Sequence, residues 1–168
     1  TNPQLAAREG TTLSMPETAE EVARRDGIAR DDADAFALRS HRLAIAAIDA
    51  GRFADEIVAV PTRSGDVAID EGPRRDTDIG ALGALRPVVD GGHVVTAGNS
   101  SSLNDGASAV VVASGEAVRR YGLAPRARIV TATTAALAPE IMGLGPVPAT
   151  EKALRRTGLT IDTIGAVE

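Results

Sequence analysis

The chain has 168 residues, which is enough for one domain, and 43% of them are apolar, as is ordinary for a globular protein. Its net charge of −5 argues against a nucleic-acid partner, and it has no apolar run of 18 residues that could span a membrane. It contains no cysteine, which excludes disulfides, thiolate metal sites and a cysteine nucleophile within these residues.

The first helix is expected after a polar, irregular stretch at residues 1–13. Ser14 and Glu17 have the spacing of a capping box, in which a hydroxyl and a carboxylate satisfy each other's backbone N–H groups. The helix is predicted to run to Asp26 and to end at Gly27, a residue type favoured just after a helix.

A longer helix is predicted over residues 31–50, ending at Gly51. The side chains expected on its apolar face are Phe36, Ala37, Ser40, Leu43, Ala44, Ala47 and Ile48, which recur with helical spacing. Three aspartates at its start, Asp31, Asp32 and Asp34, are interpreted as solvated residues at the positive end of the helix dipole rather than as an acid–base pair.

The middle of the chain reads as short strands and charged turns. Strands are expected at residues 56–60 and 67–69, followed by a charged stretch at 70–75 and a short helix at 77–85. Arg63, Arg74 and Arg75 lie in this region, and guanidinium groups suit phosphate oxygens.

A polar loop at residues 96–109 organises the second half of the chain. Gly98 and Gly106 bound it, while Ser, Asn and Asp side chains can hold such a turn in one shape. Residues 107–114 follow as a strand that is apolar on both faces, as in a strand buried between helical layers.

The remaining elements alternate between helix and strand. A helix is expected to end near residue 121, a strand at 127–132, a helix from 148 to 158, and a helical turn at 160–164. Neither His41 nor His93 has partner residues at metal-ligand spacing, so no metal site is predicted.

The loop at residues 96–109 closely resembles the Thr-Ala-Gly-Asn-x-Ser…Asp-Gly-Ala segment of thiolases. Three further stretches resemble the same family in the same order: Thr18-Ala19-Glu20-Glu21-Val22-Ala23, Asp70-Glu71-Gly72-Pro73-Arg74, and Pro139-Glu140-Ile141-Met142-Gly143-Leu144-Gly145-Pro146. Thiolases are roughly twice this length or more, so we expect the chain to be a middle piece of such a protein.

The resemblance implies an α/β fold, the thiolase-like five-layered α/β/α/β/α arrangement, only partly represented by this chain. Residues 1–92 would belong to the loop (lid) domain, 93–122 would end the N-terminal half, and 123–168 would start the C-terminal half. Alternation of helices and strands after residue 93 independently indicates the α/β class.

The resemblance also implies a thiolase-type acyltransferase acting on acyl-CoA, by thiolytic cleavage of 3-ketoacyl-CoA, as in β-oxidation, or by Claisen condensation with acetyl-CoA. Coenzyme A would be a substrate, with no covalently bound cofactor, in a cytoplasmic homodimer or homotetramer. Because thiolases use two cysteines and a Gly-His-Pro histidine, which these residues lack, the 168 residues alone are predicted to be inactive. The alternative is a non-catalytic acyl-CoA-binding or lipid-binding protein of the same fold.

The resemblance also implies roles for several individual residues. Ser101 would contact the pantetheine arm of coenzyme A, Met15 would line the thioester pocket, Arg63 would lie by the nucleotide, and Met142 would border the acyl site. Met15 could instead fill a gap in the core, and Arg63 could belong to a solvated turn. The residues expected to hold the loop's shape are Gly98, Asn99, Asp105 and Gly106.

Overall fold

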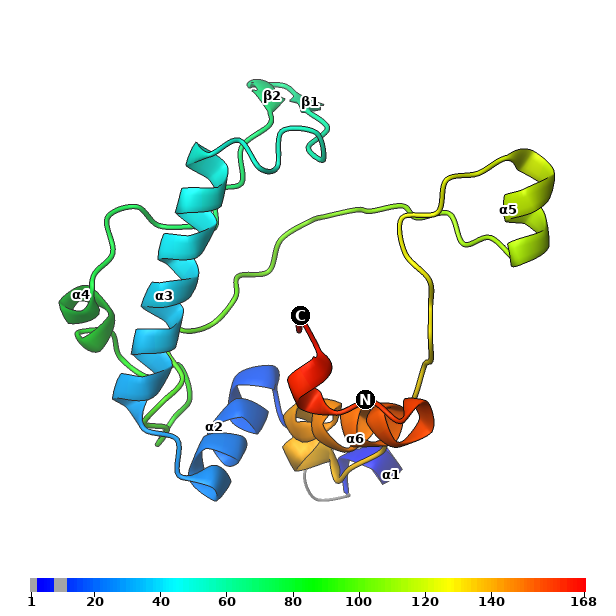
Figure 1. The fold of residues 1–168 in the computed structure, drawn as a ribbon. Coiled ribbons are helices and arrows are strands. Elements are labelled where there is room, and N and C mark those ends of the chain that lie inside the picture. Colours follow the sequence, from blue (N-terminus) through cyan, green and yellow to red (C-terminus); the bar gives the residue numbers. More distant parts are fainter. Residues whose placement is uncertain (1–2, 8–11) are drawn as a thin grey trace. The chain divides into compact units, whose positions relative to one another are not determined.

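The structure is a computed structural model that describes residues 3–7 and 12–168 (Figure 1). The expected irregular start lies partly outside the described residues, and Pro3–Ala6 form a short helix, α1. The later elements are α2 (Met15–Asp26), α3 (Arg30–Asp49), β1 (Val60–Thr62), β2 (Gly65–Val67), α4 (Ile79–Gly83), α5 (Gly115–Tyr121), the 3-10 helix η1 (Pro139–Leu144), α6 (Pro146–Thr157) and the 3-10 helix η2 (Ile161–Thr163).

The chain divides into two compact units. The first consists of Thr1–Leu103 together with Pro139–Ile141, and the second of Asn104–Ala138 together with Met142–Glu168.

Helix α2 begins at the predicted capping box. The Ser14 N–H donates to Glu17 Oε2 at 2.6 Å, and the Glu17 N–H donates to Ser14 Oγ at 3.4 Å. Hydrogen bonds from the side chain and backbone of Ser14 hold the pKa of Glu17 below its ordinary value. Gly27 ends the helix in the left-handed region with φ 66°, as predicted.

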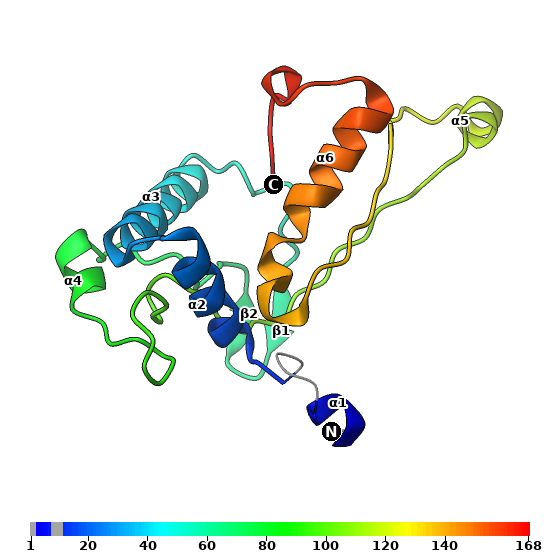
Figure 2. The ribbon, with the colours of Figure 1, turned by 90° about the horizontal axis from the view of Figure 1, so that it is seen from below.

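The covered face of helix α3 agrees only in part with the prediction, since Ala37, Ala44, Ala47 and Ile48 are half-buried as expected. Leu38 is buried against α4, which lies beside α3 in two views (Figures 1 and 2). Phe36 and Leu43, both expected to point inward, are 71% and 53% exposed. The sequence pattern marks the apolar residues correctly, but α4 covers only the side of the helix that carries Leu38.

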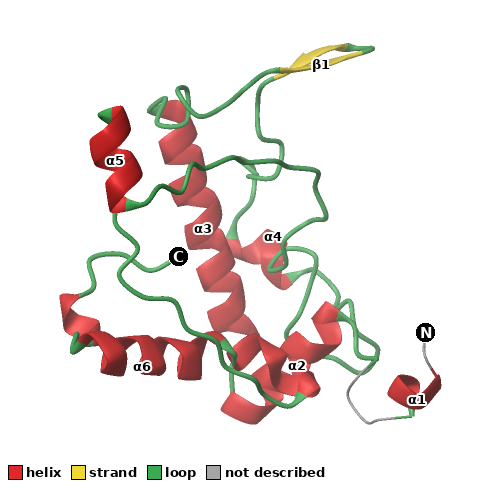
Figure 3. Cartoon of the chain, turned by 90° about the vertical axis from the view of Figure 1, so that its right-hand side faces the viewer, coloured by secondary structure: helices red, strands yellow, loops and turns green. Residues whose placement is uncertain are grey.

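The sheet is much smaller than expected. Strands β1 and β2 form an antiparallel hairpin in which Val60 pairs with Val67. Both strands lie closer to the turn than expected, and they share only Val60 and Val67 with the strands predicted at 56–60 and 67–69. Figure 3 shows this hairpin as the sheet of a mainly helical structure. Within the described residues, the α/β class is therefore represented only in part.

The predicted strands at 107–114 and 127–132 do not form. Val110, Val111 and Val112 are 87%, 91% and 75% exposed. A strand exists only when a neighbour accepts and donates its backbone hydrogen bonds, and the described residues supply no such neighbour for these segments. These two predictions are wrong for this structure, although the apolar residues that motivated them are where the sequence places them.

The second unit is organised by α6. Lys152 Nζ and Arg156 Nη1 donate to the carbonyls of Thr134 and Ala132 at 3.3 and 3.1 Å, and Thr133 Oγ1 donates to the Ala149 carbonyl at 2.7 Å. Side chains thus hold residues 132–134 along the helix, in place of a sheet. No described residue of this unit is buried.

The buried residues of the first unit lie on α2, α3, α4 and the start of the polar loop. The apolar members are Ala23, Leu38, Leu82 and Val95, and the polar members are Thr18, Asp34 and Thr96. The loop and its neighbouring helices therefore share one small core.

Candidate functional site

One carboxylate holds the residues that lead into the polar loop. Glu20, on α2, accepts at Oε1 from the backbone N–H groups of His93, Val94 and Val95, at 3.1, 2.8 and 2.7 Å. Partial burial alone would raise the pKa of Glu20, but the three backbone hydrogen bonds outweigh it and leave the pKa below its ordinary value. Glu20 thus anchors residues 93–95 to α2 as a carboxylate.

Thr96 forms the next turn from a fully buried position. Its Oγ1 accepts from the N–H groups of Gly98 at 3.2 Å and Asn99 at 3.4 Å. On its other side Thr96 forms a bridge with Pro87, and the Val88 N–H donates to the Val95 carbonyl at 2.9 Å. Residues 95 and 96 are therefore tied both to residues 87 and 88 and, through Glu20, to α2.

Asn99 closes the turn with its amide. Its Oδ1 accepts from the Thr96 N–H at 2.8 Å, and its Nδ2 donates to the Val94 carbonyl at 2.8 Å and to Asp34 Oδ1 at 2.9 Å. Both donor positions and one acceptor position of the amide are used, so its orientation is fixed by its partners.

Asp34 connects this turn to α3 and α4. Its side chain is 2% exposed and forms an ion pair with Arg30, Oδ2 to Nε at 2.7 Å. Arg30 Nη2 in turn donates to the carbonyls of Leu82 and Leu85 at the end of α4, at 2.7 and 3.1 Å. The interpretation of Asp34 as a solvated residue is wrong, because Arg30 and Asn99 satisfy its charge inside the protein. The signal available in the sequence was the Arg30–Asp34 spacing of four residues.

Gly98 and Gly106, the two glycines expected to shape the loop, lie in different surroundings. A Cβ at Gly98 would lie 2.5 Å from Leu85 Cδ1 and 2.6 Å from Leu82 Cδ2, so a larger residue requires these leucine side chains to move. A Cβ at Gly106 would meet nothing within 4 Å. Asp105 beside it is exposed and makes no hydrogen bond to the described residues, so its capping role stays a prediction.

The expected substrate contacts are exposed. Ser101 lies two residues after Asn99, Met15 is 65% exposed at the start of α2, and Arg63 lies on the exposed turn between β1 and β2. No hydrogen bond or ion pair in the described part of the chain joins these three. Met142 belongs to the second unit and is 46% exposed.

Of the other two arginines that could meet a phosphate, Arg75 is engaged in an ion pair. Its guanidinium donates to both Asp49 carboxylate oxygens, at 3.0 and 2.6 Å. The Arg74 N–H donates to His41 Nδ1 at 3.2 Å, which places that histidine as a contact between α3 and the stretch at residues 70–75.

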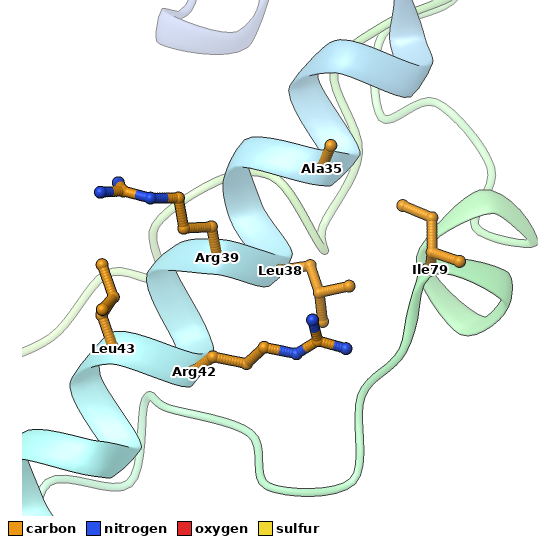
Figure 4. A pocket seen from close by; sticks show the side chains of 6 residues that line it. All are labelled: Ala35, Leu38, Arg39, Arg42, Leu43 and Ile79. Atoms are coloured by element: carbon orange, nitrogen blue, oxygen red, sulfur yellow. The ribbon is translucent and has the colours of Figure 1, made fainter.

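A hollow of about 480 Å³ lies along α3 and α4 (Figure 4). Its lining comprises Ala35, Leu38, Arg39, Arg42, Leu43 and Ile79. None of the predicted site residues lines it. Among residues 3–7 and 12–168, no three His, Asp or Glu side chains gather at metal-binding distance, and no helix is long and apolar enough to cross a membrane.

Comparison with known families assigns both parts of the chain. Residues 5–116 match the family described as thiolase, N-terminal domain, and residues 123–168 match thiolase, C-terminal domain. The chain belongs to the thiolase family.

Individual relatives agree with this assignment. The chain is 51% identical over 158 residues to a β-ketoadipyl-CoA thiolase of Pseudomonas aeruginosa, covering 92% of this chain and 39% of the relative. It is 47% identical to a 3-ketoacyl-CoA thiolase of Idiomarina loihiensis, covering 92% and 42%. The chain therefore spans about two fifths of the length of these curated relatives.

A solved structure extends the match to the fold. The acetyl-CoA acetyltransferase of Bacillus anthracis superposes with a TM-score of 0.82 at 41% identity, over 89% of this chain and 39% of that one. The described elements are thus part of a thiolase fold, even though most of the expected sheet is not formed by them.

Proposed function

We propose that this chain is the coenzyme A-contacting part of a thiolase-type acyltransferase. Two observations support the proposal: family matches that run through both thiolase domains, and similarity to proteins named as thiolases of 3-keto acyl-CoA thioesters. Coenzyme A and acyl-CoA are then substrates, the working enzyme is a homodimer or homotetramer, and its location is cytoplasmic.

The proposed reaction is thiolysis. The coenzyme A thiol ends up bonded to C3 of the 3-ketoacyl thioester, the C2–C3 bond breaks, and a proton replaces it on C2, giving acetyl-CoA and a shortened acyl-CoA. Family members pass the acyl group through a cysteine, and this chain contains none. Its own residues therefore bind and orient the thioester, and the reverse Claisen condensation uses the same contacts.

The binding roles follow the sequence-based expectations. Ser101 donates to a pantetheine amide carbonyl, Met15 and Met142 border the thioester and acyl groups, and Arg63 meets the nucleotide phosphates. Gly98 and Asn99 keep the serine in place, and Asp105 caps backbone groups of the loop. Residues 1–92, 93–122 and 123–168 are proposed as loop domain, end of the N-terminal half and start of the C-terminal half.

The Ser101 assignment is tested in a full-length thiolase that carries these 168 residues, called the full-length enzyme below. One hydrogen bond to the pantetheine arm is worth about 0.5–1.5 kcal/mol, so Ser101→Ala should raise the Michaelis constant for coenzyme A several-fold. Ser100→Ala, one residue away and equally exposed, is the control and should leave the constant unchanged. An unchanged constant in Ser101→Ala would remove the assignment.

The substrate class is proposed as a 3-ketoacyl-CoA with a second carboxylate, as in β-ketoadipyl-CoA. The observation that favours it is the name of the relative that is 51% identical. The test compares kcat/KM for 3-oxoadipyl-CoA and for 3-oxohexanoyl-CoA, which has the same chain length without the second carboxylate. We expect a higher value with 3-oxoadipyl-CoA, and a preference for 3-oxohexanoyl-CoA would instead point to the 3-ketoacyl-CoA class.

A further inference from the structure

Side chains hold most of the backbone amides that precede Ser101. The N–H groups of His93, Val94 and Val95 donate to Glu20, and that of Thr96 donates to Asn99. The two amides that follow Ala97 donate to Thr96 Oγ1. Six amides in a stretch of seven residues are thus bound by side chains.

Two of the groups that hold this stretch come from distant helices. Glu20, on α2, lies 73 positions before His93 in the sequence. Asp34, on α3, lies 65 positions before Asn99. Asp34 is buried between Arg30 and the Asn99 amide, and Arg30 is fixed to the end of α4. The turn is therefore fastened to three helices through two carboxylates and one guanidinium.

We propose that Glu20, Asp34 and Asn99 are positioning residues for substrate binding, acting through Ser101. The inference rests on the proposed pantetheine contact of Ser101. Consecutive Cα atoms lie 3.8 Å apart, so Ser101 is within two such steps of the last residue whose amide and side chain are fixed. The pantetheine arm is flexible and loses freedom when it binds. If the Ser101 hydroxyl is already in place, no further binding energy is spent on ordering the loop that carries it.

We assign these two carboxylates no contact of their own with the substrate. Glu20 Oε1 is occupied by three backbone N–H groups, and Asp34 is buried with both oxygens engaged. The carboxylates therefore affect substrate binding only by positioning the loop that carries Ser101. The size of this effect should depend on how much of the pantetheine arm the substrate has.

The test uses the full-length enzyme and two acyl donors with coenzyme A as acceptor: acetoacetyl-CoA, and the acetoacetyl thioester of N-acetylcysteamine, which lacks most of the arm. Thiolysis passes through an acyl-enzyme, so kcat/KM for the donor reports only the first half of the reaction. Glu20→Ala should lower kcat/KM for acetoacetyl-CoA by about tenfold, since small misplacements of a binding group cost rate, and should lower it less than twofold for the short donor. Glu20→Gln keeps an oxygen acceptor and should restore most of the loss.

Equal losses on both donors in an active enzyme, or no loss with acetoacetyl-CoA, would overturn the positioning role and leave the proposed function standing. A wild-type enzyme that turns over neither donor would overturn the proposed function and this inference with it. If Glu20→Ala does not fold, Asp34→Asn carries the same comparison: it keeps the side-chain volume and an acceptor for Asn99, and should show the same dependence on the donor.

Discussion

Asp34 shows why single residues of this site were hard to assign from sequence. Its spacing from Arg30 was readable, but its burial depends on Asn99, which lies 65 positions away. Gly98 and Asn99 were correctly placed in the polar loop, whereas the partners that give them their present contacts, Leu82, Leu85 and Asp34, lie on other elements. Local sequence patterns identify the residues of the loop, whereas their contacts depend on the tertiary fold.

Asp34→Ala is expected to destabilise the full-length enzyme strongly. Removing one partner of a buried ion pair costs about 3–5 kcal/mol, because the guanidinium of Arg30 stays partly buried without a counter-charge. Asp32→Ala, two residues away and exposed, is the control and should change stability little. Thermal unfolding measures both variants, and equal midpoints for the two would contradict the buried-pair assignment.

Gly98→Ala is expected to loosen the loop from α4. Its Cβ would overlap Leu82 and Leu85, and overpacking of this kind typically costs about 1–3 kcal/mol. Gly106→Ala meets open space and should be close to neutral. Hydrogen exchange of the amides at residues 98 and 99 reports the loosening directly. Unchanged protection in Gly98→Ala would show that the leucines move aside without cost.

At the scale of elements, the helices were predictable, whereas the strands were predictable only at the β1–β2 hairpin. The capping box at Ser14 and Glu17 and the stop at Gly27 are local signals, and all of them are present in the structure. The segments at 107–114 and 127–132 carry strand-like sequences, but a strand needs a partner that local sequence does not provide. The covered face of α3 was predicted only in part for a related reason, since it depends on where α4 lies.

The contact between Glu20 on α2 and the backbone of residues 93–95 should weaken at acidic pH. The pKa of Glu20 is lowered in the folded protein, so its contribution to stability is fully present above the ordinary value of 4.5 and is lost as the pH falls through the folded pKa. Glu20→Gln removes this part of the pH dependence. The difference between wild-type and Glu20→Gln unfolding temperatures should therefore shrink as the pH falls below 4.5.

Glu71→Gln, at an exposed position outside any helix, is the control for that titration. Its unfolding temperature should follow the wild type across the same pH range. A wild-type to Glu20→Gln difference that stayed constant with pH would show that the carboxylate charge of Glu20 does not hold residues 93–95.

At the scale of the whole molecule, one apolar segment has no strand partner for its backbone. Val110, Val111 and Val112 are exposed in an extended segment, and unpaired strand-like segments invite association with other chains. The isolated chain is therefore predicted to associate and to show weak amide protection. Sedimentation and hydrogen exchange test this, and a compact, well-protected monomer would contradict it.

Val111→Lys should reduce that association, because a charge on a strand edge opposes pairing. Ala50→Lys adds the same charge at an exposed position at the end of α3 and should leave association unchanged. Equal association of the two variants would assign the interaction to another surface.

We propose that these residues serve thiolysis rather than passive binding of coenzyme A thioesters. The most direct measurement incubates the full-length enzyme with 3-oxoadipyl-CoA and coenzyme A and separates the thioesters formed. Thiolysis should give acetyl-CoA and succinyl-CoA in equal amounts, formed only when coenzyme A is present. Tight binding of the thioester without any cleavage would contradict it and would identify a non-catalytic acyl-CoA-binding protein of the same fold.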